Sequence, residues 1–228
     1  MLNWVFTEDE KQIIISLLTK GKEEQSKNDK FAIIDFESFY KLFNKDEIEI
    51  YKKYLSINPK NLNYKLPYLG LVDVPNNIVA IPNQEYERNG KKEILDCQYL
   101  PKEVFEVYVK LNEAIQSKID KKLLVLYGYR SPARQVFMFF DILQRIYDFD
   151  FNKTVKRVCF PAYSEHVYSK RQAMDFVTQA GIKGEGFEKT VEYKWLQENA
   201  EKFGFIESYP KDNNLGMMWE SWHWCLAK

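Results

Sequence analysis

Apolar residues recur at helical spacing in several stretches of this chain. Thr7 stands just before one such stretch, and Glu10 follows it three positions later. This pairing is typical of a capped helix start, so we predict a helix over residues 7–20 that ends near Gly21. Further helices are predicted over residues 36–55, 101–119, 131–147 and 187–203, with Ser131-Pro132 beginning the third of these and Gly204 ending the last.

Short apolar runs bounded by turn residues predict strands between these helices. The runs lie at residues 123–127, 173–178 and 218–226. The Asn89-Gly90 step predicts a tight turn that links two more strands. Helices and short strands in this irregular order predict an α+β fold, with a small antiparallel sheet flanked by helices.

The first quarter of the chain differs from the rest. Residues 1–60 contain only helix-forming, core-facing patterns and no candidate chemistry, so we predict a helical extension there. One further domain is predicted over residues 61–228, without internal repeats. Aromatic residues make up 16% of the chain, which favours a well-packed folded protein over disorder.

The charge balance excludes two classes of partner. Lys and Arg number 33, as do Asp and Glu, so the formal net charge is zero. Nucleic acids and anionic membranes require clustered, uncompensated cations, so we expect neither as a partner.

The apolar run at residues 13–18 is too short to cross a bilayer, so no transmembrane segment is predicted. The first ten residues do not resemble a secretory leader; we expect action at the cell envelope or periplasm if a leader was removed, and in the cytoplasm if the chain is complete as given.

Both histidines of the chain have carboxylates near them in sequence. His166 follows Glu165 and precedes Asp175 by nine positions, and His223 follows Glu220 by three. Two imidazoles and one carboxylate can bind zinc and leave a fourth position for water. Zinc lowers the pKa of such a water, and a further carboxylate can then act as general base. Glu220 and Glu165 are both candidates for this base.

More ordinary interpretations exist for the same residues. Either histidine alone is more simply a structural hydrogen-bonding residue, and the aromatic run around His223 more simply core. On a strand, Glu220 and His223 would point to opposite faces, so Glu220 must lie in a loop or bulge before the strand if both face one site. Cys225 would share a face with His223, but nothing nearby supplies an orienting Asn or Asp. The three cysteines, Cys97, Cys159 and Cys225, form no disulfide framework or thiol metal motif.

Several segments, in the right order, resemble the VanY-type zinc D-Ala-D-Ala carboxypeptidase family. The resemblance covers roughly residues 64–226 and implies the fold of the hedgehog/DD-peptidase group of zinc peptidases. Its segments are Gly128-Tyr129-Arg130-Ser131 with Gln135, Ser164-Glu165-His166, Ala173-Met174-Asp175-Phe176, the helix and turn from Trp195 to Pro210, and Glu220-Ser221-Trp222-His223-Trp224.

The resemblance implies roles for these residues. His166, Asp175 and His223 would hold one Zn²⁺ per chain, and Glu220 would be the general base. Arg130 would meet the peptide carbonyl or the terminal carboxylate, since its planar fork suits oxyanions; the alternative is a surface ion pair. Substrate contacts are expected from Ser164, Gln135, Ser131 and Trp222, while Tyr163 and Trp224 are further groove candidates, of which Trp224 is better interpreted as core.

The chain departs from the family pattern between His166 and Asp175. This loop is two residues longer than usual, and Arg171 stands where the family has Gly. Loops absorb such insertions at little cost, so the site can survive it. Lys170 and Arg171 either favour an acidic substrate or are merely solvated. The family's usual Arg-Tyr-Val-Gly ending is absent after His223.

The resemblance implies a zinc peptidase that hydrolyses D-amino-acid-containing peptides of peptidoglycan. Removal of a terminal D-Ala from a stem peptide is the favoured reaction. The alternatives on the same fold are a D-Ala-D-Ala dipeptidase and a peptidoglycan endopeptidase of the endolysin kind. A catalytically inactive module that binds zinc or peptidoglycan is the alternative from another class, and the presence of Glu220 argues against it.

Overall fold

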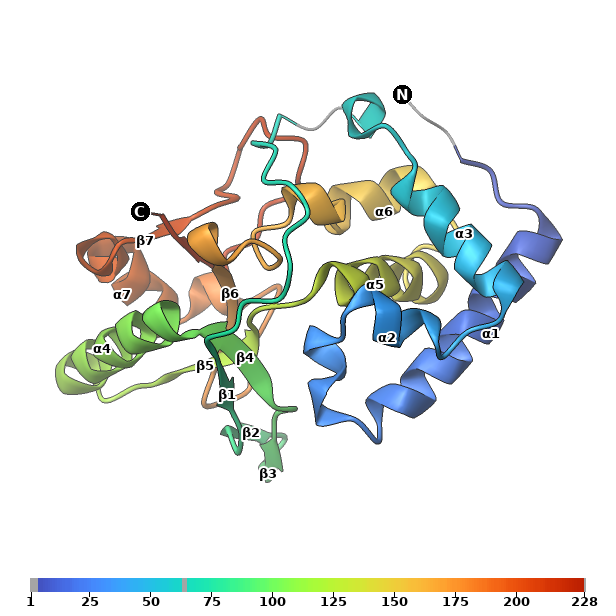
Figure 1. Cartoon of the computed structure of the whole chain (residues 1–228). Coiled ribbons are helices and arrows are strands. Elements are labelled where there is room, and N and C mark those ends of the chain that lie inside the picture. Colours follow the sequence, from blue (N-terminus) through green and yellow to red (C-terminus); the bar gives the residue numbers. More distant parts are fainter. Residues whose placement is uncertain (1–3, 63–64, 228) are drawn as a thin grey trace. The chain divides into compact units, whose positions relative to one another are not determined.

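The computed structural model describes residues 4–62 and 65–227, so the predicted start of the family-like region at Tyr64 lies outside the described residues. The chain forms two compact units (Figure 1). Each unit has its own hydrophobic core. We call them the helical unit, residues 1–74, 131–164 and 214–218, and the sheet unit, residues 75–130, 165–213 and 219–228. The helical unit contains the predicted extension at 1–60 together with later segments. A domain boundary at residue 60 stays a prediction.

The first helix of the helical unit starts as predicted and ends later than predicted. Thr7 and Glu10 form the expected capping box at the start of α1 (Glu8–Gln25). Gly21 does not end this helix. A Cβ at Gly21 would lie 2.1 Å from the Phe137 ring, so the glycine permits close helix packing in mid-helix.

The predicted helix over 36–55 is two helices, α2 (Phe36–Tyr40) and α3 (Lys45–Leu55). Asn44 lies between them and caps α3 by accepting a hydrogen bond from the backbone N–H of Glu47. The helix predicted over 131–147 is α5 (Pro132–Arg145), with Ser131 as its N-cap as expected. One helix of this unit, α6 (Phe151–Arg157), was not predicted from the sequence.

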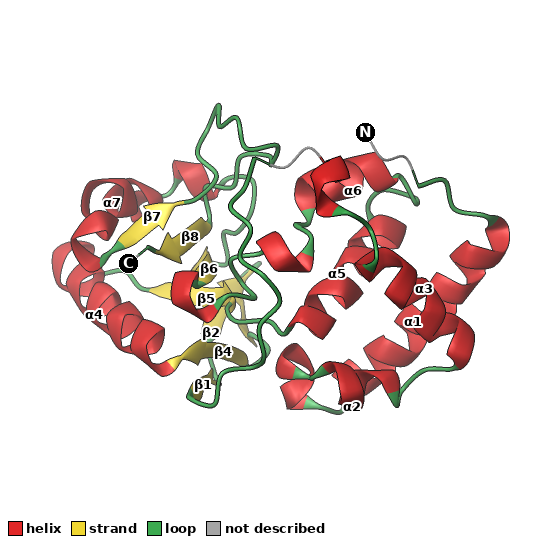
Figure 2. Ribbon diagram, turned by 45° about the horizontal axis from the view of Figure 1, so that its top comes forward, coloured by secondary structure: helices red, strands yellow, loops and turns green. Residues whose placement is uncertain are grey.

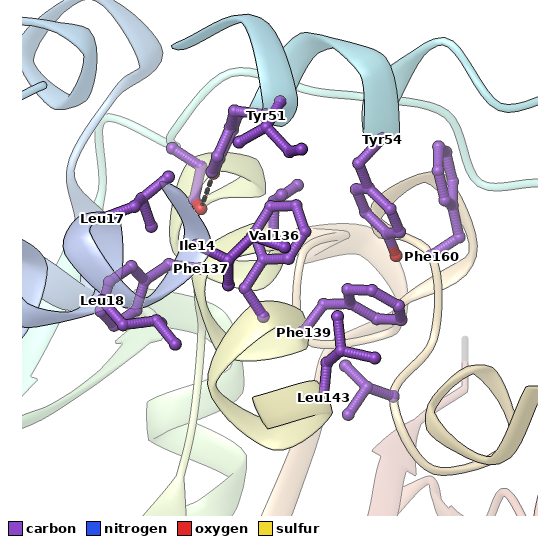
Figure 3. Packing of buried hydrophobic residues seen from close by; sticks show 14 of the residues in the cluster. Ile14, Leu17, Leu18, Tyr51, Tyr54, Val136, Phe137, Phe139, Leu143 and Phe160 are labelled. Atoms are coloured by element: carbon purple, nitrogen blue, oxygen red, sulfur yellow. Dashed lines mark hydrogen bonds between the residues drawn. The ribbon is translucent and has the colours of Figure 1, made fainter. Parts of the chain in front are cut away.

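Aromatic and aliphatic side chains together form the core of the helical unit (Figure 3). Tyr54 of α3 stacks on Phe139 of α5 at a ring-centroid distance of 4.3 Å. The hydroxyl of the fully buried Tyr51 donates to the backbone carbonyl of Ala133. The stacked ring of Tyr54 adds apolar contact area to the core. The hydrogen bond of Tyr51 satisfies its buried hydroxyl, which would otherwise have lost its contact with water. Helix α5 packs against α1, and its Phe139 and Phe140 rings contact Tyr54 and Tyr51 of α3.

The sheet unit is built on a four-stranded antiparallel sheet with strand order β5-β6-β8-β7 (Figure 2). Two short hairpin-like pairs, β1 with β4 and β2 with β3, accompany it. The predicted α+β class, with a small antiparallel sheet flanked by helices, is confirmed. The elements are β1 (Ile78–Ile81), β2 (Glu85–Arg88), β3 (Lys91–Ile94), β4 (Gln98–Pro101), α4 (Lys102–Ile119), β5 (Leu123–Tyr127), β6 (Ala173–Thr178), α7 (Val191–Asn199), β7 (Phe205–Glu207) and β8 (His223–Leu226).

Turn and strand predictions for this unit are largely confirmed. Asn89 and Gly90 join β2 to β3 with positive φ angles of 52° and 73°, as the Asn-Gly step predicts. Strands β5 and β6 have the predicted bounds. The final strand starts only at His223, because residues 221 and 222 form a turn instead of continuing a strand from Met218. Gly204, at φ +81°, closes the helical segment that follows α7.

One face of the sheet is covered by α4 and α7. Met174 and Phe176 of β6 and Trp224 and Leu226 of β8 point to this side and belong to one core cluster with residues of both helices. Because side chains alternate along a strand, Asp175 and His223 point to the opposite face. The apolar packing of one face therefore decides where the polar residues of the other face lie. No helix in the described part of the chain is long and apolar enough to cross a bilayer.

Glu47 of α3 is a buried carboxylate that contacts two side chains of α1. Its side chain is 1% exposed and accepts hydrogen bonds from the Ser16 hydroxyl at 2.7 Å and the Lys20 ammonium at 2.8 Å. Burial acts to raise the pKa of Glu47, but the hydrogen bonds from Lys20 and Ser16 outweigh it and lower the pKa. The charged form thus stabilises the contact between α1 and α3.

We expect Glu47→Gln to lower the free energy of unfolding by roughly 1.5–3 kcal/mol at pH 7, the usual contribution of hydrogen bonds to a charged group. Since folding lowers this pKa, the stabilisation is present above the ordinary value of 4.5 and is lost as pH falls. The difference between wild type and variant should therefore shrink below pH 4.5 in urea unfolding. Glu49→Gln, on the exposed side of the same helix, is the control and should change stability little. Equal effects of both variants would contradict this role.

Candidate metal centre

Strand pairing brings two of the predicted zinc ligands together. In the register of β6 with β8, Asp175 lies directly opposite His223. Asp175 Oδ1 is 2.8 Å from His223 Nδ1, although the two residues are 48 positions apart. Both side chains are buried, on the sheet face that α4 and α7 do not cover.

The third predicted ligand, His166, reaches the same point from the loop before β6. Its Nε2 lies 3.3 Å from Asp175 Oδ1. The two imidazole rings meet edge to face, with centroids 4.9 Å apart. The ligand atoms of His166, Asp175 and His223 all lie within 4.8 Å of one another. The structure therefore places the three predicted metal ligands in one cluster.

A second partner on each imidazole determines which nitrogen faces the cluster. Nδ1 of His166 is 2.8 Å from the Gly128 carbonyl oxygen and donates to it, which leaves Nε2 for a metal. Nε2 of His223 is 3.0 Å from a carboxylate oxygen of Glu165, which leaves Nδ1. The two histidines thus present different ring nitrogens to the same point.

Gly128 is required by close backbone packing. A Cβ there would lie 2.3 Å from the carbonyl oxygen of Tyr99 on β4, and the next residue, Tyr129, donates its N–H to that same oxygen at 2.7 Å. No larger residue fits this approach. The glycine of the Gly-Tyr-Arg segment therefore holds the carbonyl that orients His166.

The two histidines have opposite pKa shifts. Burial and the nearby Arg130 charge outweigh the attraction of Asp175 and lower the pKa of His166 to about 4. Burial also acts to lower the pKa of His223, but its hydrogen bonds to Asp175 and Glu165 outweigh this and raise it to about 10. Burial would raise the pKa of Asp175, yet the two imidazoles hold it below its usual range. A metal at this point would replace the proton on His223 Nδ1.

Glu220 lies beside the cluster. Its carboxylate oxygen is 3.7 Å from His223 Nδ1, the nitrogen that faces Asp175. Glu220 lies in a turn before β8, as it must if it is to face the same site as His223. The His223 N–H closes this turn by donating to the Glu220 carbonyl at 3.0 Å. Glu165, the other candidate base, faces Nε2 on the far edge of the same ring.

Arg130 is buried in the sheet unit at 7% exposure, so it is not the surface ion pair considered as the alternative. Its backbone N–H donates to the His166 carbonyl at 2.9 Å. Its guanidinium carbon lies 5.5 Å from the centroid of the Tyr127 ring. The charge of Arg130 acts on the pKa of His166, so a permanent cation lies near the metal ligands.

The residues expected to contact substrate each lie at a defined place within the protein. In the helical unit, Ser131 caps α5, and the Gln135 amide donates to the Cys159 carbonyl at 2.9 Å. Ser164 is buried at the end of a short 3₁₀ turn in the same unit, which also holds Tyr163. Trp222 is buried in the core cluster of the sheet unit, and so is Trp224, as expected. Substrate contact by Ser131, Gln135, Ser164 and Trp222 stays a prediction.

Three residues near the cluster make contacts that were not predicted from the sequence. Glu165 binds the far edge of the His223 ring, and Arg171 binds Glu165 with Nε at 2.6 Å from Oε1. The ring of Tyr209 lies over His223 with centroids 4.7 Å apart. Tyr209 belongs to the segment from Trp195 to Pro210 that resembles the family, and this resemblance could have indicated that it lies near the site. No local pattern indicates the contact of Arg171.

The donor set fits zinc. Two neutral imidazole nitrogens and one carboxylate are ligands that Zn²⁺ prefers in catalytic sites, where a fourth position stays open. In the described part of the chain this is the group of His, Cys, Asp and Glu side chains that could hold a metal ion. Cys97, Cys159 and Cys225 do not belong to this group.

Two histidines and an aspartate that face one point, with a glutamate beside them, are the arrangement of a zinc peptidase. Residues 97–227 match the VanY family, whose description is D-alanyl-D-alanine carboxypeptidase. This match covers more than half of the chain, and the chain belongs to the VanY family. The predicted family membership is therefore confirmed.

Two curated relatives and one solved structure agree with this assignment. The chain is 29% identical over 178 residues to the putative carboxypeptidase YodJ of Bacillus subtilis (strain 168), over 70% of this chain and 63% of the relative. It is 27% identical over 154 residues to a D-alanyl-D-alanine carboxypeptidase of Enterococcus faecium, over 66% and 45%. The chain thus spans less than two thirds of these relatives. The structure of the LdcB LD-carboxypeptidase matches with a TM-score of 0.53 and 28% identity, over 75% of this chain and 78% of that one.

We expect purified protein to contain about one zinc per chain, measured by elemental analysis, and His166→Ala and His223→Ala to lose it. The sequence holds two histidines, so no third imidazole can replace either. Asp175→Ala should weaken zinc binding in the same way. Glu198→Ala, at an exposed position of α7, is the control and should keep the metal. Zinc retained in both histidine variants would contradict the assigned centre.

Proposed function

We propose that this protein is a zinc-dependent carboxypeptidase that removes a terminal D-alanine from the stem peptides of peptidoglycan. The observation that carries the proposal is the Glu220 carboxylate beside the three metal-ligand side chains. A purely structural zinc site has no need of a spare carboxylate, whereas peptide hydrolysis needs a general base. The description of the family supports the substrate class.

His166, Asp175 and His223 are the residues that would hold the zinc. Bound there, zinc supplies Lewis-acid polarisation of the scissile carbonyl and of the attacking water. Glu220 accepts the proton of that water and delivers it to the amine of the departing D-alanine. Its position next to His223 Nδ1, the ligand nitrogen, supports this role over the alternative of Glu165.

Arg130 binds an oxyanion of the substrate in this proposal. Its guanidinium offers a planar fork of donors that matches the terminal carboxylate of a peptide or the developing charge on its carbonyl oxygen. The backbone link between Arg130 and His166 fixes the start of this side chain relative to the ligand cluster. A carboxypeptidase needs such a cation because it selects the last residue of the peptide.

A second candidate is an L,D-carboxypeptidase, which would remove a terminal D-residue that follows an L-configured centre. The match to the LdcB LD-carboxypeptidase favours it, because that structure has a TM-score of 0.53 against this chain. Both reactions release one D-alanine. They differ in the residue that precedes the scissile bond.

Mass spectrometry of purified muropeptides after incubation with the full chain and zinc separates these activities. Our proposal predicts that a pentapeptide stem loses one D-alanine and that the resulting tetrapeptide is stable. Further conversion of the tetrapeptide to a tripeptide would assign the L,D activity. Loss of a dipeptide, cleavage of cross-linked stems or hydrolysis of free D-Ala-D-Ala would instead assign an endopeptidase or dipeptidase. If no substrate changes although zinc is bound, the enzymatic proposal is contradicted. The hypothesis of a catalytically inactive module that binds zinc or peptidoglycan would then remain.

Glu220→Gln should keep the zinc and lower kcat by roughly 10²–10⁴-fold, the usual contribution of a general base. The amide retains the size of the side chain but cannot accept the proton. Zinc content by elemental analysis and D-alanine release should be measured on the same preparation. Glu198→Gln, on the exposed surface of α7, is the matched control. Full activity of Glu220→Gln would refute the assignment of the base.

A further inference from the structure

The loop from residue 167 to residue 172, which departs from the family pattern, is attached at its ends to the sheet. The Ala173 N–H donates to the Glu165 carbonyl at 3.1 Å, and the Leu226 N–H of β8 donates to the Gln172 carbonyl at 2.9 Å. Arg171 ends a short 3₁₀ turn in this loop and donates its backbone N–H to the Tyr168 carbonyl at 3.0 Å. The loop thus has a defined path next to the last strand.

Each carboxylate oxygen of Glu165 has its own partner. Oε1 is 2.6 Å from the Arg171 guanidinium Nε, and Oε2 is 3.0 Å from His223 Nε2. The Glu165 side chain is 6% exposed, and the Arg171 side chain is one-third exposed. A buried carboxylate needs compensation for its lost hydration, and the arginine provides it. We expected Arg171 either to favour an acidic substrate or to be merely solvated. Its guanidinium instead forms an ion pair with Glu165 of the same chain.

We propose that Arg171 and Glu165 are positioning residues that orient His223 so that Nδ1 faces the metal. Arg171 fixes one oxygen of Glu165, and the other oxygen then holds the proton on Nε2. A proton held on Nε2 leaves the lone pair of Nδ1 for the metal, at the point where Asp175 Oδ1 and His166 Nε2 also lie. The inference rests on the zinc centre of the proposed function. It adds that the longer loop contributes to metal affinity.

The geometry separates this role from catalysis. Glu165 lies at the edge of the imidazole ring opposite to the one that Asp175 contacts, so its carboxylate acts through His223. Arg171 in turn acts through Glu165. Removing either should weaken zinc binding, because outer partners of ligand residues typically contribute 10- to 100-fold in affinity.

The test is zinc affinity, measured by competition with a chelating dye, in the full chain. We expect roughly 100-fold weaker binding in Glu165→Ala and roughly 10-fold in Glu165→Gln and Arg171→Gln. Arg171→Lys keeps the charge and should recover part of the loss. Lys170→Gln removes a cation from the exposed neighbouring position and is the matched control, with affinity within about twofold of wild type. Thermal unfolding of the metal-free variants checks that each one folds.

A spectroscopic signature separates positioning from general destabilisation. In ¹⁵N-labelled, zinc-loaded protein only two imidazoles give signals, and nuclear Overhauser contacts from each ring to its own backbone assign them. We expect His223 to carry its proton on Nε2 and this proton to exchange slowly with water, and to exchange faster in Glu165→Ala and Arg171→Gln. Zinc affinity and proton exchange equal to those of Lys170→Gln would overturn the inference. A wild type that binds no zinc would overturn the metal centre itself.

Discussion

The pairing of β6 with β8 is the contact on which the candidate metal centre depends. In this register Asp175 lies opposite His223, and their neighbours Met174 and Trp224 lie opposite each other on the other face. That other face is packed against α4 and α7, and burying each large apolar side chain there contributes about 1.5–3 kcal/mol. A slip of one residue would turn the whole set of side chains around. Apolar packing on one side of the sheet therefore places polar ligands on the other.

The third ligand is placed by backbone chemistry at the end of β5. The register between β5 and β6 shifts between Val125 and Tyr127, and the chain then passes so close to Tyr99 that only a glycine fits at position 128. The Gly128 carbonyl that results from this path orients His166. Three elements that are far apart in sequence thus meet at one point, and each brings one ligand or the partner that orients it.

Much of the fold follows from local pattern, and the failures have physical reasons. Strand β6 was predicted because it is a short apolar run, and helix α4 because its apolar residues repeat at helical spacing. Gly21 was wrongly taken as the end of a helix, because the Phe137 ring that packs on it comes from a helix more than a hundred residues away. The site ligands were predicted because the chain offers few imidazoles and a family pattern orders them. The contact of Arg171 with Glu165 depends on the path of a loop, which local pattern does not determine.

His166 Nε2, Asp175 and His223 Nδ1 are the atoms between which we expect one zinc to bind. Anomalous X-ray diffraction from crystals of the zinc-loaded protein, recorded on both sides of the zinc absorption edge, locates the metal directly. We expect one strong anomalous peak bounded by these three ligand atoms, with the Glu220 carboxylate beside it and outside direct coordination. A peak elsewhere in the chain, or zinc bound to Nε2 of His223 in place of Nδ1, would contradict it.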